Sequence, residues 1–379
     1  MEFKQILARP HKFCFQNTRS DELSDELWRK LIARSIRASS QKHPNMKPLL
    51  IILIFASACL AQDPVKQLSE ITDDVEKRLS TLKVSDDLKQ QCTADIAEAR
   101  ANIKLKNLYL SLYTIRTCQL ELASLAYAEA KSDLRKKGID VFETEWRELG
   151  SSLNEREKIL ADRTTKLPAV IVALADVSQS QARPYYQSGK LFALNSNMAE
   201  GLYYLGRAPA NLDFAIMCRG LQLSRPKKAT TVFRSPHPEL TQLEAMALRT
   251  YKSADVSTQQ AQYNRVNSNL KIAGELDRAS MFEGALLKYL ESKFYFGLII
   301  TTAEREDLQH LRERTKEMEK LLNSDKVDNS IGLLFWQLAD RSLNPDGKVE
   351  PSAAQIKRAV VILNQVLPGY FDYLKETRQ

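Results

Sequence analysis

Glycine and histidine are both scarce in this chain, whose 379 residues include 12 glycines and 4 histidines. The alternating Val, Ile and Thr pattern of a half-buried strand is nearly absent, whereas Leu, Ala, Glu, Lys, Gln and Arg, all good helix formers, dominate. These shortages argue against a sheet. We predict an all-α fold of antiparallel helical hairpins, arranged either as a stacked solenoid or as an irregular helical bundle.

Familiar catalytic and cofactor-binding motifs are also missing. The chain has no HExxH, CxxC, P-loop, GxGxxG or GxSxG sequence. Beyond residue 61 the histidines are His237 and His310, and neither has a second histidine or a cysteine at metal-ligand spacing. We therefore expect no cofactor, no metal site and no enzymatic activity of a familiar class.

The longest apolar run, residues 46–61, has the three parts of a secretory signal peptide. Lys47 supplies the basic start, residues 49–55 the apolar core, and residues 56–61 the small side chains that precede a cleavage site. The run is shorter than the roughly 20 residues of a membrane-spanning helix. We expect export to the periplasm or the extracellular space, with a short buried helix or an uncleaved anchor as the alternative.

Two cleavage sites remain open, one after Ala58 and one after Ala61. Residues 56–59 also resemble a bacterial lipobox, in which Cys59 is acylated and becomes the first residue. The lipobox prefers Leu at the position that Ala56 occupies here. We expect membrane attachment only through lipidation of Cys59 or through an uncleaved signal.

Residues 1–45 precede the signal and show no periodic apolar pattern. Because signals begin at the initiator methionine, we interpret Met46 as the natural start and residues 1–45 as a non-native extension or a disordered segment. Residues 1–61 hold 10 Lys and Arg against 5 Asp and Glu, which leaves 45 against 42 for the rest of a chain with a net charge of +8. A nearly neutral exported part makes a nucleic-acid partner unexpected.

Three cysteines follow the signal, at positions 92, 118 and 218. Cys92 and Cys118 lie on the apolar stripes of two successive predicted helices, at equal distances from a turn near Leu105. Equidistant positions face each other across an antiparallel hairpin, and an exported protein permits disulfides, so we expect these two cysteines to pair. Two buried thiols are the alternative, and Cys218 has no evident partner.

Helical periodicity divides the exported part into two regions. Residues 62–223 form an N-terminal helical region and residues 239–379 a C-terminal one. Between them, residues 224–238 form a basic loop with three prolines. In the first region we expect Pro184 to open a separate helix that runs through Tyr204.

Two segments of the chain have similar sequences, RANIKLKNLYLSLYTIR at 100–116 and AGELDRASMFEGALLKY at 273–289. When Asn107 is placed on Ser280, apolar and aromatic positions coincide on both sides of the turn. The pattern resembles the tetratricopeptide repeat, although neither copy has that family's closing proline. The resemblance implies stacked helical hairpins that present a concave surface to a peptide or protein.

Two sets of residues are candidates for binding. An aromatic set could line a partner groove, and comprises Tyr185, Tyr186, Phe192, Tyr203 and Tyr204. A basic set could contact an anionic lipid or polymer, and comprises Arg225, Lys227, Lys228 and Arg234. The alternatives are a buried aromatic core and a solvated linker.

The first functional hypothesis is an exported, non-enzymatic helical scaffold that binds a peptide or protein partner. One alternative is a helical envelope enzyme whose site combines carboxylates and tyrosines from distant parts of the chain. The other is an envelope component anchored by lipid at Cys59.

Overall fold

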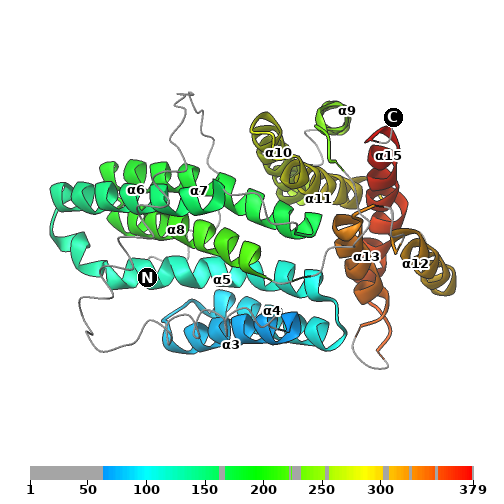
Figure 1. Cartoon of the computed structure of the whole chain (residues 1–379), viewed down its shortest axis with the longest axis horizontal. Helices are drawn as coiled ribbons and strands as arrows, with labels where there is room; N and C mark the ends of the chain where they lie inside the picture. Colours follow the sequence, from blue (N-terminus) through cyan, green and yellow to red (C-terminus); the bar gives the residue numbers. More distant parts are fainter. Residues whose placement is uncertain are drawn as a thin grey trace, which may run out of the picture. The chain divides into compact units, whose positions relative to one another are not determined.

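The computed structural model describes residues 63–161, 167–221, 223, 232–251, 256–301, 307–323, 327–345 and 349–377. Within these ranges every regular element is helical, which confirms the predicted all-α class (Figure 1).

Residues from Pro64 onward belong to one compact unit. Its first elements are α3 (Pro64–Thr81), α4 (Asp86–Lys104), α5 (Leu108–Ala130), the 3-10 helix η2 (Ser132–Lys136), α6 (Ile139–Ala161), α7 (Ala169–Leu194) and α8 (Met198–Gly220). They are followed by α9 (His237–Thr250), α10 (Val256–Arg278), α11 (Phe282–Ile300), α12 (Leu308–Leu322), α13 (Ser330–Leu343), α14 (Ala353–Val361), the π-helical turn η4 (Ile362–Val366) and α15 (Leu367–Thr377).

Three helical hairpins, α4–α5, α7–α8 and α10–α11, turn in the same way. In each turn one non-glycine residue has a left-handed backbone: Lys106 (φ 60°), Ser196 (φ 61°) and Ser280 (φ 57°). The next residue then donates its backbone N–H to a carbonyl five positions back, over 2.8, 2.9 and 2.9 Å. Such a bond satisfies a carbonyl that the helix end leaves without a partner.

This shared turn corrects the register of the internal repeat. Lys106, not Asn107, is equivalent to Ser280, because these two residues hold the left-handed position. Sequence similarity alone also missed the third copy at Ser196. The left-handed residues are separated by about 90 and 84 positions, whereas a tetratricopeptide repeat has a period of about 34.

The hairpins pack in a continuous order. α5 packs on α8, α8 pairs with α7, and α7 contacts α11, while α4 and α10 lie beside α5 and α11 (Figure 1). α5 and α8 approach closely at Gly206, where a Cβ atom would lie 2.7 Å from Cβ of Tyr127. α7 thus contacts the second helix of every hairpin, α5, α8 and α11.

The expected helix break at Pro184 is wrong. α7 runs through Pro184 without interruption, and the chain instead turns at Ser196, between α7 and α8. A proline inside a helix removes one backbone hydrogen bond. Packing of α7 against α8 and α11 holds both halves of the helix in line.

The C-terminal helices close the other side of the unit. α13 contacts α5 and α7, and η4 packs on α11. Tyr370 and Tyr373 of α15 are fully buried there. The predicted loop 224–238 extends too far toward the C-terminus, because α9 already begins at His237. Pro238 lies in the first turn of α9, a position that proline tolerates.

Candidate functional site

A cavity of about 160 Å³ lies where the three hairpins meet. Helices α5, α7, α8, α10 and α11 all contribute to its wall. The lining residues are Arg116, Thr117, Leu120, Val177, Gln181, Tyr185, Arg207, Asn211, Ile272 and Lys288. Thr117 is exposed and marks the rim. Because its walls come from segments as far apart as α5 and α11, the cavity depends on the tertiary fold.

The second helix of each hairpin places one cation in the cavity wall. These are Arg116 of α5, Arg207 of α8 and Lys288 of α11. Charged side chains inside a protein are expected to be paired, because removing them from water is costly. The partners of the three cations therefore decide what the cavity is able to bind.

Lys288 is only 8% exposed and has two polar partners. Its ammonium group lies 2.6 Å from Oε2 of Glu291 and donates to Oδ1 of Asn269 over 3.2 Å. The other carboxylate oxygen of Glu291 accepts a hydrogen bond of 3.1 Å from the hydroxyl of Tyr113. Both oxygens of Glu291 are thus engaged.

Arg207 is also paired. Its guanidinium lies 2.7 Å from Oε1 of Glu121, and the hydroxyl of Tyr203 donates to the other oxygen of the same carboxylate. Burial raises the pKa of Tyr203, so that this phenol stays protonated and remains a donor. Arg207 and Tyr203 both contact the carboxylate of Glu121 and so join α8 to α5, although Nη1 of Arg207 makes an ion pair there without a hydrogen bond.

Arg116 differs from the other two cations. Among the described residues no carboxylate lies within ion-pair distance of its guanidinium, and its buried Nε has no hydrogen-bond partner. Its guanidinium carbon lies 5.7 Å from the centre of the Phe214 ring. Burial lowers the pKa of Arg116, the nearby carboxylate of Glu291 acts against that shift, and Arg207 adds a smaller lowering. Burial also lowers the pKa of Lys288, while Glu291 acts against this shift and Arg116 adds to it.

Most of the aromatic set comes together as a stack, and one member lies apart. The Tyr204 ring is stacked on Tyr185 and on Phe192, with ring centres 5.8 and 4.9 Å away, and meets the edge of Tyr203. Tyr186 is instead buried against Trp146, with ring centres 4.7 Å apart. Of the five, Tyr185 reaches the cavity wall.

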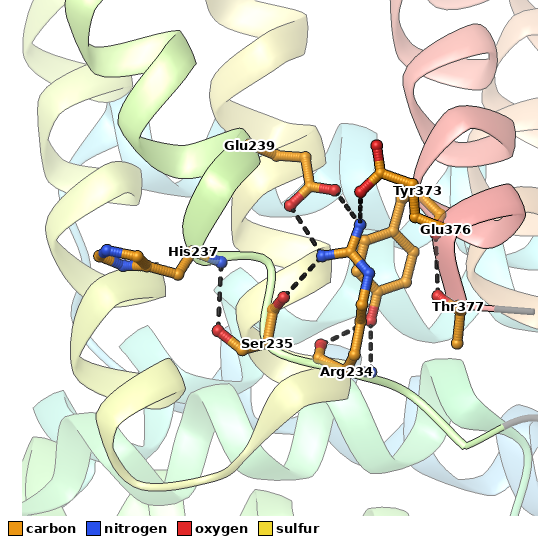
Figure 2. A network of polar contacts seen from close by, with 7 residues as sticks. All are labelled: Arg234, Ser235, His237, Glu239, Tyr373, Glu376 and Thr377. Atoms are coloured by element: carbon orange, nitrogen blue, oxygen red, sulfur yellow. Dashed lines mark hydrogen bonds and ion pairs between the residues drawn. The ribbon is translucent and has the colours of Figure 1, made fainter. Parts of the chain in front are cut away.

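Arg234 of the basic set is held inside the fold. Figure 2 shows its guanidinium between Glu239 at the start of α9 and Glu376 of α15, bonded to both carboxylates. The hydroxyl of Tyr373 accepts from the backbone N–H of Arg234 over 2.8 Å and donates to its carbonyl over 2.6 Å (Figure 2). The ion pairs of Arg234 thus connect α15 to the segment before α9 and to the first turn of α9. Arg225, Lys227 and Lys228 lie outside the described residues, as does Cys59.

Cys92 and Cys118 form a disulfide between α4 and α5, with Cα atoms 5.5 Å apart. Both are completely buried in a small apolar cluster that joins α3 to the first hairpin. Cys218 is a free, buried thiol in α8, and burial raises its pKa. It therefore has the character of a core residue rather than of a nucleophile.

The three cavity cations were missed in the sequence analysis. The signal that could have found them is a charged residue next to apolar positions of a predicted helix. Arg116 follows Ile115, Arg207 precedes Ala208, and Lys288 follows Leu287, and those three apolar neighbours are all buried.

No protein-family model, curated protein or solved structure matches this chain. In the described part of the chain, none of the helices is long and apolar enough to cross a bilayer. The same residues contain no cluster of three or more His, Cys, Asp or Glu side chains that could hold a metal ion.

Proposed function

We propose that this protein is an exported, non-enzymatic helical scaffold that binds a peptide or protein partner at the cavity between its three hairpins. The observation that carries the proposal is the cation Arg116, which lies in the cavity wall without an ion-pair partner. A half-buried charge without a partner is unfavourable in the free protein, and an incoming ligand of opposite charge relieves that cost.

The size of the cavity favours a macromolecular partner. Pockets that enclose a drug-sized ligand measure about 300–1,000 Å³, whereas this cavity holds about 160 Å³. That volume accommodates one side chain or one terminal group. The rest of the ligand then lies outside, on the surface around Thr117, as in a peptide or a protein segment.

The envelope-enzyme alternative receives no support from the cavity. Tyr203 and Arg207 both bind Glu121, and burial raises the pKa of Tyr203 instead of lowering it. A phenol acting as a base at neutral pH requires a lowered pKa. Export itself rests on the signal-like residues 46–61, which lie outside the described ranges.

Site-specific photo-cross-linking in the native cells tests the proposal. A photoreactive amino acid replaces Thr117 at the cavity rim, and a matched variant carries it at Thr93, an exposed residue of α4 outside the cavity. We expect a discrete partner to be captured through position 117 and not through position 93. Equal capture at both positions, or none at either, would contradict the proposal.

A further inference from the structure

We infer that Arg116 anchors a single carboxylate of the bound partner, so that the ligand class is a peptide with an acidic side chain or a free C-terminus in the cavity. This inference rests on the proposed function, which leaves the chemistry of the partner open. In the free protein the Nε atom of Arg116 has no hydrogen-bond partner and its guanidinium lies near the Phe214 ring, so binding a carboxylate would give this cation a polar partner.

The cations of the cavity wall outnumber their carboxylate partners by one, so a ligand with one negative charge would balance them. Of its three cations, Arg207 is paired with Glu121 and Lys288 with Glu291. Both oxygens of Glu291 are already engaged, by Lys288 and by Tyr113. Arg116 also feels the charge of Glu291, but this one carboxylate serves both Lys288 and Arg116, so the three groups together keep one net positive charge.

The shape of the guanidinium favours a carboxylate. Arginine offers a planar set of N–H donors that matches the two oxygens of a carboxylate. A phosphate group also matches this fork, but it carries about −1.5 to −2 charges at pH 7 and exceeds the single charge available. Two polar side chains, Gln181 and Asn211, lie in the same wall and can complete the hydrogen bonding of the ligand.

The position of Arg116 explains why a short group is sufficient. Arg116, which is half-buried, and Thr117, which is exposed, both line the cavity, so the guanidinium is not sealed off from the surface. A terminal carboxylate, or the side chain of Asp or Glu, can reach it while the peptide backbone remains outside. Recognition of a terminal carboxylate is a recurring mode of peptide binding.

Fluorescence anisotropy with three sets of labelled hexapeptides tests the inference on residues 62–379. One set has a free C-terminus and no acidic side chain, the second has an amidated C-terminus and one internal Glu, and the third is amidated and neutral. We expect the first or the second set to bind and the neutral set to bind at least about tenfold more weakly, because a charge-assisted hydrogen bond contributes about 1.5–3 kcal/mol. Which acidic set binds identifies the source of the carboxylate.

Variants of the protein connect this preference to Arg116. Arg116→Met keeps the aliphatic stem and should reduce the binding of acidic peptides about 10- to 100-fold, whereas Arg116→Lys should restore part of it. Arg135→Met removes an equal charge from the exposed helix η2, outside the cavity wall, and should leave binding unchanged. Thermal unfolding followed by circular dichroism verifies that each variant is folded.

The possible outcomes separate the inference from the proposed function. If all three peptide sets bind equally, Arg116 anchors no carboxylate, while a peptide-binding scaffold still stands. If no set binds, the inference is overturned, and photo-cross-linking through position 117 decides independently whether a partner exists. Acidic peptides that bind Arg116→Met as tightly as the unmodified protein also overturn it.

Discussion

The disulfide between Cys92 and Cys118 leads to a quantitative prediction about stability. The two cysteines are separated by 26 positions in the sequence. In the chain-entropy treatment, a cross-link that closes a loop of this length stabilises the folded state by about 3.5 kcal/mol at 25 °C, because it restricts the unfolded chain. The perturbation is the double substitution Cys92→Ala with Cys118→Ala, which opens the loop.

The change in melting temperature follows from the size of the folded unit. A unit of roughly 300 residues has an unfolding entropy of about 0.6 kcal/mol/K, so that a loss of about 3.5 kcal/mol lowers the melting temperature by about 5–6 °C. The disulfide lies in the apolar cluster between α3, α4 and α5. Hydrogen exchange should therefore accelerate first in these three helices.

Thermal unfolding with and without a phosphine reductant is the assay. Reduction should lower the melting temperature of the unmodified protein toward that of the double variant, and the double variant should not respond to the reductant. Peptide mapping of the unreduced protein verifies the bond directly. Free thiols at both positions, or identical unfolding of the reduced and oxidised protein, would refute the reasoning.

Three further substitutions test the packing, the ion-pair network and the buried phenols. Gly206→Ala should destabilise the protein by about 1–3 kcal/mol in urea unfolding, because the new methyl group overlaps α5. The matched control Gly274→Ala meets no atom within 4 Å and should be neutral or stabilising by up to about 1 kcal/mol. Arg234→Met should cost about 1–3 kcal/mol, since it leaves the largely buried carboxylate of Glu239 without its partner, and unchanged urea unfolding would contradict this role. Burial, reinforced by a nearby carboxylate, raises the pKa of Tyr109 to about 12. This phenol thus contributes stability that is fully present below pH 10 and is lost between about pH 10 and 12. Tyr109→Phe should make the decline of stability in this window less steep, and an unchanged decline would argue against the raised pKa.

Helical class could be predicted from composition, but the boundaries of the hairpins could not. Helices commonly end with glycine in the left-handed conformation, whereas Lys106, Ser196 and Ser280 take this position here. A lysine or serine gives no such signal in a sequence. Pro184 wrongly indicated a helix start, because tertiary contacts of α7 outweigh the backbone hydrogen bond that a proline removes.

The candidate site was less accessible to sequence analysis than the fold. The pairing of Cys92 with Cys118 depends on a single local hairpin, and its geometry follows from counting residues to the turn. Arg116 and Lys288, by contrast, come from helices α5 and α11, and only the packing of three hairpins places them in one cavity wall. The missing ion pair of Arg116 is a property of that packing.

A crystal structure of residues 62–379 with a short acidic peptide tests the central claim most directly. The account predicts a carboxylate oxygen within hydrogen-bond distance of the Arg116 guanidinium, with the peptide backbone crossing the rim at Thr117. A cavity that stays empty at a saturating peptide concentration, or a peptide bound at another surface, would contradict it.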